Sequence, residues 1–265
     1  MFFIFLFLIF ACGYSYLFYA LINQELIYLC AWIPLGIIVA LITVVMIVIN
    51  IFWIGSFTKP KKFLKHFTLR QVVWLVLKYL RIKLVIEGKE NIPQGTYVIY
   101  SNHKSNMDPL MLYYAMHRKV TAIGKKSLFK TSIMKMVGKC FDAIALDRED
   151  DREAAKSIAS GIKKVKNGLP IIIFPEGGIK SRETDEMVNL RAGAYKLATK
   201  ANAPILPCSI IGNSKIKTKK RFEKVIVKII FHKAIEPQDY ENMNTTEIGN
   251  MVGEIINNGV KSANI

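Results

Sequence analysis

The first 58 residues constrain the fold of this chain more than any other feature. The only charged side chain in this segment is Glu25, and Phe, Leu, Ile and Val dominate it. Two apolar runs, 2–22 and 26–55, flank a short polar turn, and each is long enough to cross a bilayer, which takes about 20 helical residues. We therefore expect 1–58 to form a hairpin of two transmembrane helices.

A cleaved signal peptide is the alternative explanation of the first apolar run. Such a peptide carries basic residues before its apolar part, but here the apolar part starts at Phe2 and no basic residue precedes it. A second, longer apolar run follows directly, which favours the hairpin.

Charge is distributed very unevenly along the chain. All 37 Lys and Arg residues lie after Thr58, together with 19 of the 20 acidic residues, so 59–265 carries a formal charge of +18. Lys59, Lys61 and Lys62 follow the second apolar run at once. Because basic residues concentrate on the cytoplasmic side of membrane helices, we predict an integral protein of the cell (plasma) membrane whose downstream domain is cytoplasmic.

A strongly basic domain beside a bilayer indicates an anionic partner. Anionic lipid headgroups attract each well-placed Lys or Arg by about 1 kcal/mol. Nucleic acid is the alternative partner, but two apolar spans favour an anionic membrane surface, so we expect no nucleic acid. The basic and apolar run 59–82 allows two interpretations, an amphipathic helix in the membrane interface or a helix packed on the domain.

The cysteines give no sign of a metal site. They show no C-x-x-C spacing, and two of the four lie in the apolar runs. We therefore expect no bound metal, and no disulfides on the cytoplasmic side.

The rest of the chain, 83–265, alternates β-like apolar runs with helix-like stretches. The clearest helix is predicted over 150–167, where acidic residues crowd the start and lysines the end. This alternation predicts an α/β domain with a largely parallel sheet flanked by helices, and ligands bind such sheets where strands end. The predicted strands are 83–88, 96–102, 120–124, 142–147, 169–174, 204–211 and 224–231.

His103 and Asp108 stand between a predicted strand and a predicted helix, in the stretch NHKSNMDP. Asp at the N-cap with Pro109 at the first helical position is a common helix start, so Asp108 also has a purely structural explanation. Together, the two residues place an imidazole at the ligand-binding edge of the sheet, with a carboxylate near enough to hold one ring nitrogen. The other nitrogen would act as a base, and since the chain has no G-x-S-x-G motif, it would act on a hydroxyl of the substrate.

Two further polar segments follow predicted strands. Glycines in IIIFPEGGIKSR (171–182) let the backbone approach a ligand, and its basic residues can neutralise a phosphate. In ALDREDD (145–151), Arg148 stands among four carboxylates. Taken alone, each segment is better explained as surface structure: a turn in the first case, and salt bridges at a helix start in the second.

Together these segments resemble the glycerolipid acyltransferase family, most closely the bacterial 1-acylglycerol-3-phosphate acyltransferases. NHKSNMDP matches the family's His-x4-Asp motif, AIALDR its strand ending in Asp-Arg, FPEG its third motif, and APILPCSI its later strand with two prolines. KKSLFKTSIMKMVGKC (125–140) is similar to the family's Lys-Ser/Glu-Leu-Phe stretch. The resemblance covers 85–235 and rests on the order and spacing of four motifs.

The resemblance implies a role for each candidate residue. His103 would be the general base, Asp108 its orienting partner, and Arg148 a phosphate ligand. Glu176 and Gly177 would contact the glycerol part of the acceptor. The family usually continues Phe-Pro-Glu-Gly with Thr-Arg-Ser, whereas this chain continues with GIKSR, so the second phosphate ligand is either Lys180 or Arg182.

The implied reaction moves a fatty acyl group from a thioester donor, acyl-CoA or an acyl carrier protein, to the free sn-2 hydroxyl of lysophosphatidic acid in phospholipid synthesis. No other cofactor is implied. Two alternatives stay open: glycerol 3-phosphate or another lysophospholipid as acceptor, or a non-catalytic membrane module that binds anionic lipid or nucleic acid. The expected domains are the hairpin 1–58, an interfacial helix 59–82 and a cytoplasmic acyltransferase domain 83–265.

Overall fold

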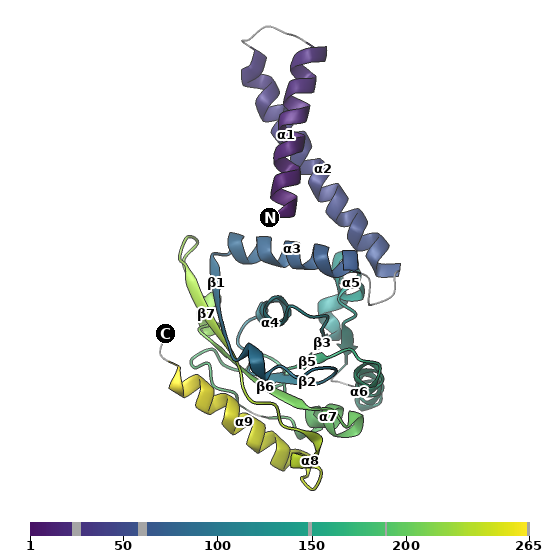
Figure 1. The fold of residues 1–265 in the computed structure, drawn as a ribbon, viewed down its shortest axis with the longest axis vertical. Coiled ribbons are helices and arrows are strands. Elements are labelled where there is room, and N and C mark those ends of the chain that lie inside the picture. The colour runs from purple at the N-terminus through teal and green to yellow at the C-terminus, as the bar shows by residue number, and fades with distance from the viewer. Residues whose placement is uncertain (23–27, 58–62, 148–149, 189, 264–265) are drawn as a thin grey trace. The chain divides into compact units, whose positions relative to one another are not determined.

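The computed structural model describes residues 1–22, 28–57, 63–147, 150–188 and 190–263 (Figure 1). The chain divides into two compact units, 1–72 and 73–265. One predicted phosphate ligand, Arg148, lies outside the described residues.

The first unit is dominated by two long apolar helices, α1 (Phe2–Leu21) and α2 (Leu29–Phe57). They pack along each other, and the hydroxyl oxygens of Tyr14 and Thr43 are 3.3 Å apart. Few residues of either helix are buried, so their apolar side chains mostly face outward. Length and composition allow both helices to cross a membrane, and they fit the predicted hairpin.

The next helix, α3 (Phe63–Tyr79), lies within the basic run 59–82. Leu69, Val73 and Leu77 recur once per turn and are buried, whereas Tyr79 is 80% exposed. The buried residues therefore lie along one face of the helix. Its place in a membrane interface stays a prediction, as do the domain boundaries.

A mixed sheet forms the centre of the second unit. In the described residues its strand order is β1-β7-β6-β2-β5-β3-β4, and all neighbours are parallel except the antiparallel pair β6 and β7. This confirms the predicted, largely parallel α/β sheet. The strands are β1 (Ile82–Glu87), β2 (Val98–Ser101), β3 (Thr121–Lys125), β4 (Ile144–Leu146), β5 (Ile171–Ile173), β6 (Ile205–Ile211) and β7 (Val225–Phe231).

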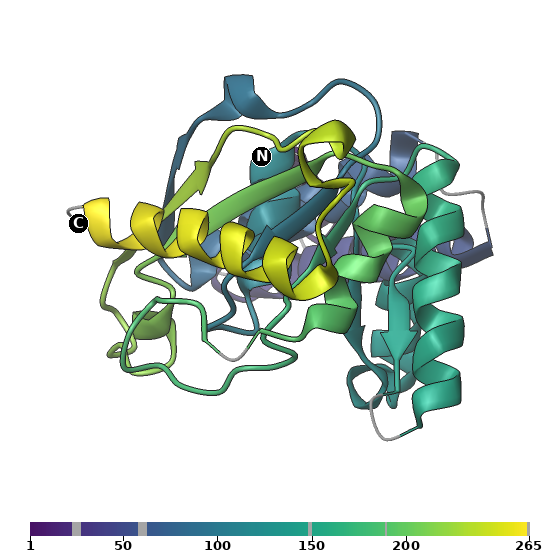
Figure 2. The same cartoon turned by 90° about the horizontal axis from the view of Figure 1, so that it is seen from below.

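The central strands are buried on both faces because helices cover both. Every residue of β2, β5 and β6 is buried, which is typical of strands in the middle of a parallel sheet. Figure 1 shows α4 on one face of the sheet and α7 and α9 on the other, and Figure 2 shows α9 running across that second face. The helices of this unit are α4 (Asp108–Met116), α5 (Ser132–Cys140), α6 (Asp151–Lys166), α7 (Lys196–Ala201), α8 (Pro237–Tyr240) and α9 (Thr245–Ser262), with the 3-10 turns η2 (Lys89–Asn91), η3 (Lys126–Phe129), η4 (Ala192–Tyr195) and η5 (Ser214–Ile216).

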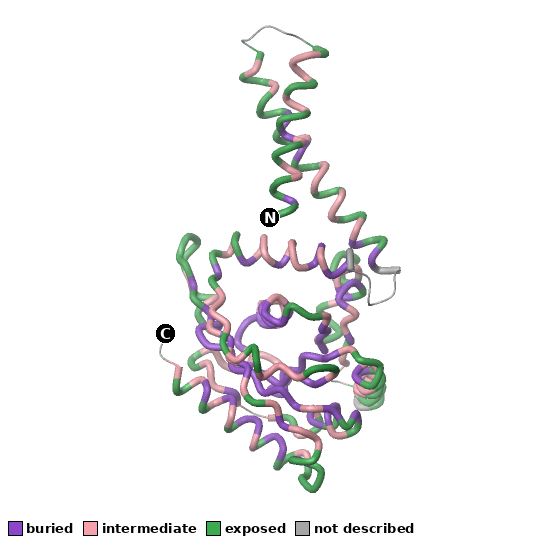
Figure 3. The backbone as a smooth tube through the Cα atoms, viewed as in Figure 1, coloured by how far each residue is buried: buried purple, intermediate pink, exposed green. Residues whose placement is uncertain are grey.

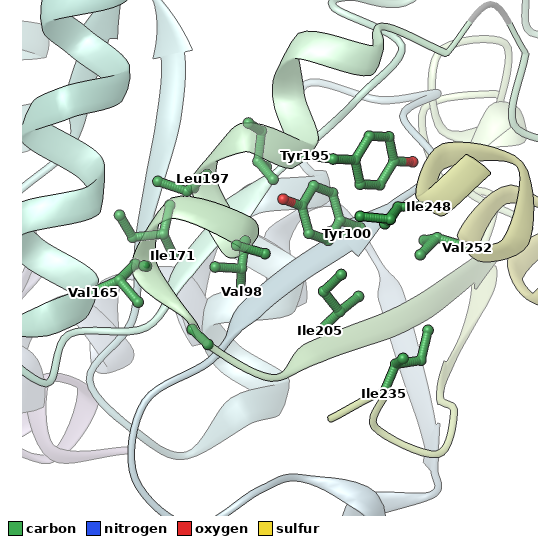
Figure 4. Close-up of a cluster of buried hydrophobic side chains, with 14 of the residues drawn as sticks. Val98, Tyr100, Val165, Ile171, Tyr195, Leu197, Ile205, Ile235, Ile248 and Val252 are labelled. Atoms are coloured by element: carbon green, nitrogen blue, oxygen red, sulfur yellow. The ribbon is translucent and has the colours of Figure 1, made fainter. Parts of the chain in front are cut away.

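The main core lies between the sheet and the layer of α7 and α9 (Figure 4). Buried residues also lie in α4, on the other face of the sheet (Figure 3). The rings of Tyr100 and Tyr195 stack in the main core, with centroids 4.5 Å apart. Burying one large aliphatic side chain stabilises a fold by about 1.5–3 kcal/mol, so this layer fixes the central strands on which the polar loops stand. Its aliphatic members include Val98, Ile171, Leu197, Ile205 and Val252.

The predicted helix 150–167 is present as α6. The side chain of Asp150 caps it by accepting the backbone N–H groups of Arg152 and Glu153. Ile158 and Ile162 pack against the core, as their spacing predicts.

Candidate active site

Three polar loops meet at one edge of the sheet because β6, β2 and β5 are adjacent and parallel. Their carboxyl ends point the same way, so the residues that follow them gather there. His103 follows β2, Glu176 follows β5 and Asn213 follows β6.

His103 and Asp108 form the predicted hydrogen-bonded pair. Nδ1 of His103 lies 2.9 Å from Oδ2 of Asp108, whose side chain is fully buried. The same oxygen accepts the backbone N–H groups of Lys104 and Ser105 at 2.9 Å, and Oδ1 accepts the amide of Asn213 at 3.0 Å. A carboxylate held by four donors can fix which imidazole nitrogen carries the proton.

Asp108 starts the helix in a different way from the one predicted. It is the first residue of α4, and the N-cap is Met107, which makes no side-chain capping bond. The Asp108 carboxylate instead accepts N–H groups of the preceding loop, because it is turned toward His103 and away from the first turn of α4. The predicted N-cap assignment is therefore wrong.

His103 is held by contacts of its ring and of its backbone, and the ring nitrogen Nε2 is left open. Its ring stacks on Phe174 with centroids 4.3 Å apart and planes at 21°, and its backbone N–H donates to Oε1 of Glu176 at 2.7 Å. Its side chain is 16% exposed. Within the described part of the chain, Nε2 has no hydrogen-bond partner, so it can accept a proton from a ligand.

Lys104 and Glu176 form a buried ion pair that is linked to the backbone of His103. Their side chains are 0% exposed, and Nζ of Lys104 donates to Oε2 of Glu176 at 2.9 Å. Since Oε1 of Glu176 accepts the His103 N–H, both oxygens of this carboxylate are bound within the protein. The predicted contact of Glu176 with an acceptor stays a prediction, and the structure gives this residue a second, internal task.

Asn102 and Asp185 join the loops to one another. The side chain of Asn102 donates to the carbonyl oxygens of Asp185 and Ile210 and accepts the N–H of Ile210. The carboxylate of Asp185 accepts the N–H groups of Gly212 and Ser214 at 2.6 and 3.1 Å. These contacts fix the loops after β2 and β6 against the 174–191 segment.

The other predicted ligands among the described residues lie in that segment. Gly177 has φ +72°, the left-handed region that glycine favours, and a side chain there would collide with Arg191. Nε of Arg182 donates to the carbonyl oxygen of Lys104 at 2.9 Å, so Arg182 is tied to the loop of His103. Lys180 is exposed.

The sequence predictions missed several residues of this site, among them Asn213, Lys104 and Asp185. Asn213 follows a predicted strand in the same way as His103, so the end-of-strand rule could have identified it. Lys104 gave no comparable signal, because a lysine in a loop is nearly always exposed. Asp185 lies in no predicted element. In the described ranges, no three His, Cys, Asp or Glu side chains gather as metal ligands, and the absence of a cofactor stays a prediction.

The second unit is an α/β domain whose sheet edge carries a hydrogen-bonded histidine and aspartate. The Acyltransferase family model matches residues 83–211. The chain is 30% identical over 211 residues to "Probable 1-acyl-sn-glycerol-3-phosphate acyltransferase" of Mycoplasma pneumoniae, covering 73% of this chain and 78% of that protein. It is 28% identical over 191 residues to "1-acyl-sn-glycerol-3-phosphate acyltransferase" of Borreliella burgdorferi, covering 70% and 76%.

A solved structure has the same fold. The crystal structure of the 1-acyl-sn-glycerophosphate acyltransferase of Thermotoga maritima superimposes with a TM-score of 0.65 over 80% of this chain and 86% of that chain, at 21% identity. The chain belongs to the glycerolipid acyltransferase family that its motifs resemble, and it is an acyltransferase.

Proposed function

We propose that this protein is a membrane-bound 1-acylglycerol-3-phosphate acyltransferase that makes phosphatidic acid from lysophosphatidic acid. The observation that carries the proposal is the His103–Asp108 pair. Nε2 of His103, the ring nitrogen not bound to Asp108, is open at the sheet edge where ligands bind. The names of the similar proteins from Mycoplasma and Borreliella support the choice of acceptor.

The chemistry follows from the geometry of the pair. With the proton on Nδ1 held by Asp108, Nε2 of His103 takes the proton of the sn-2 hydroxyl as its oxygen attacks the thioester carbonyl. The C–O bond forms, the C–S bond breaks, and the departing thiolate takes the proton back from His103. Backbone N–H groups of the first turn of α4 or a nearby basic side chain would stabilise the tetrahedral oxyanion.

Basic residues of the loops that follow the predicted strands suit an acceptor that carries a phosphate. Arg148, Lys180 and Arg182 are the proposed phosphate ligands. Arg182 is supported by its bond to the His103 loop, which uses Nε and leaves the other guanidinium nitrogens for a ligand. The choice between Lys180 and Arg182 stays open. The thioester donor is either acyl-CoA or an acyl carrier protein.

Membrane attachment fits this reaction because acceptor and product are lipids. The apolar helices α1 and α2 would span the cell membrane, and the basic residues after them would keep the catalytic unit on the cytoplasmic side, where the thioester donor is made.

The decisive experiment gives purified full-length protein lysophosphatidic acid together with each donor, beside a His103→Ala variant. We expect acyl transfer with at least one donor and a loss of about 10²–10⁴ in kcat for the variant, the usual value of general-base help. Thermal unfolding of the variant controls for folding. Wild-type turnover in His103→Ala would contradict the proposal. Faster acyl transfer to glycerol 3-phosphate than to lysophosphatidic acid in the same assay would make glycerol 3-phosphate the acceptor instead.

A further inference from the structure

Two exposed segments of the second unit combine basic residues with protruding apolar side chains. The α5 segment, 125–139, has five lysines and no acidic residue, and the β6–β7 segment, 215–224, has six basic residues and one acidic residue. Large apolar side chains stand exposed in both. They are Leu128 (56% exposed), Ile133 (65%), Met134 (43%) and Phe222 (73%).

Both segments start from the sheet edge that holds the His103–Asp108 pair. The strands β6, β2, β5 and β3 are consecutive and parallel, so their carboxyl ends lie along one edge. His103 and Glu176 follow the inner strands β2 and β5, while the β6–β7 segment follows β6 and the α5 segment follows β3. The two segments therefore flank the site.

The composition of these segments fits a lipid surface. Exposed apolar side chains between lysines are typical of protein parts that lie in a bilayer interface, where the apolar groups enter the boundary of the acyl chains and the lysines meet anionic headgroups. Figure 1 shows α5 and the connection between β6 and β7 on opposite sides of the same end of the second unit. A flat, extended partner such as a bilayer can contact both segments at once.

We propose that the α5 and β6–β7 segments form a docking face for an anionic lipid bilayer, with the acyl-transfer site between them. This deepens the proposed function, on which it rests for the nature of the acceptor. A face of this kind would hold the open nitrogen of His103 at headgroup level, where the hydroxyl and phosphate of a lysophospholipid lie.

The test measures lysine modification in the full-length protein, reconstituted in nanodiscs so that both membrane faces are accessible. A water-soluble amine reagent is applied in discs of phosphatidylcholine and in discs that also contain phosphatidylglycerol. We expect Lys130, Lys135, Lys217 and Lys220 to react at least about tenfold more slowly in the anionic discs, and high salt to reverse this. The exposed Lys163 and Lys166 of α6 serve as internal controls and should not change.

Substitutions of the exposed apolar residues complete the test without changing the charge of the protein. The triple variant Ile133→Ser, Met134→Ser, Phe222→Ser should lose most of the protection, whereas Met243→Ser should keep it. Met243 is also exposed, but it lies in the connection between α8 and α9, at the other end of the unit. If the triple variant lacks the wild-type unfolding transition, Phe222→Ser alone takes its place.

Each outcome decides the proposal. Equal rates in neutral and anionic discs overturn it, and so does protection that appears only when acyl carrier protein is added, since the partner is then an acidic protein. Because the readout does not need turnover, protection without any acyl transfer would leave the docking face standing and reject the proposed function instead.

Discussion

At the scale of single residues, the buried carboxylate of Asp108 depends on donors from distant parts of the chain. Three of its four donors lie in the loop 103–105, and the fourth is Asn213, 105 residues later. Asn213 is fully buried and, within the described residues, its Oδ1 has no partner. Its amide therefore contributes mainly by holding Asp108, and through it the imidazole of His103.

Replacing Asn213 by Ala should lower kcat with little change in the KM for the acceptor. A hydrogen bond to a charged group is worth about 1.5–3 kcal/mol, so we expect a loss of at least about tenfold. Steady-state kinetics with lysophosphatidic acid measures both constants.

Asn257→Ala is the matched control for that variant. Asn257 makes two hydrogen bonds to Met187 and contacts neither His103 nor Asp108 among the bonds of its side chain. It should lower the unfolding temperature and leave kcat unchanged. An equal drop in kcat for both variants would show that Asn213 acts only through stability.

The Lys104–Glu176 pair gives a second prediction at this scale. Lys104→Met leaves the Glu176 carboxylate buried without its cation, which costs about 3–5 kcal/mol for a buried pair. Adding Glu176→Gln to that variant should recover much of the lost free energy of unfolding, because no unpaired buried charge then remains. A double-mutant cycle on the free energy of unfolding measures the coupling.

Kinetics of the same variants separate the two tasks of Glu176. If its carboxylate acts by holding the His103 loop, Glu176→Gln should lower kcat and leave the KM for the acceptor near its wild-type value. A rise in that KM with unchanged kcat would assign Glu176 to acceptor binding, as the family resemblance implies.

At the scale of elements, a serine and a histidine fasten α9 to the sheet. Oγ of Ser209 in β6 donates to the carbonyl oxygen of Ile256 in α9 at 2.8 Å and lies 2.7 Å from Nε2 of His232. Because the hydroxyl has one proton, Nε2 of His232 must donate to it. The approach is close, since a side chain at Gly259 of α9 would collide with both His232 and Ser209.

This contact predicts a pH-dependent stability. Burial lowers the pKa of His232 below its ordinary value of 6.5. As the pH falls through 6.5, the unfolded chain takes up a proton that the folded chain does not, so the free energy of unfolding decreases down to the lowered pKa.

His232→Gln should therefore reduce the fall in unfolding temperature between about pH 7.5 and about pH 5.5. Thermal unfolding in detergent at both pH values measures it, with the wild type as reference. The same fall in both proteins would show that His232 does not contribute.

At the scale of the whole molecule, an apolar hairpin is combined with a basic α/β unit. All Lys and Arg residues follow the hairpin in sequence. The chain as a whole has a formal charge of +17. The proposed reaction needs both parts, because the acceptor is a lipid and the donor is carried in water.

Deleting 1–58 should greatly reduce turnover of lysophosphatidic acid embedded in liposomes, while turnover of a short-chain, water-soluble acceptor is retained. The ratio of the two rates, compared with that of the full-length protein, is the measurement. A truncated protein that does not bind liposomes and still turns over embedded acceptor at the full rate would refute the role of the hairpin.

Most of the fold and part of the site could be predicted from the sequence. Each of the seven strands among the described residues overlaps a predicted one, and α1, α2 and α6 occur where they were expected. The His103–Asp108 pair followed from a motif of six residues, because one short loop separates the two partners. The predicted N-cap role of Asp108 was wrong, since a local pattern does not show where a carboxylate turns.

The sequence by itself determined the apolar hairpin, the α/β class and the local histidine pair, because periodicity, charge and short spacing act between neighbours in the chain. Only the tertiary structure decided that Asn213 holds Asp108, that Lys104 and Glu176 are a buried pair, and that α5 and the β6–β7 connection flank the site. The reason is the strand order. Placing β6, β2, β5 and β3 side by side brings together loops that are far apart in sequence, and no local pattern contains that order.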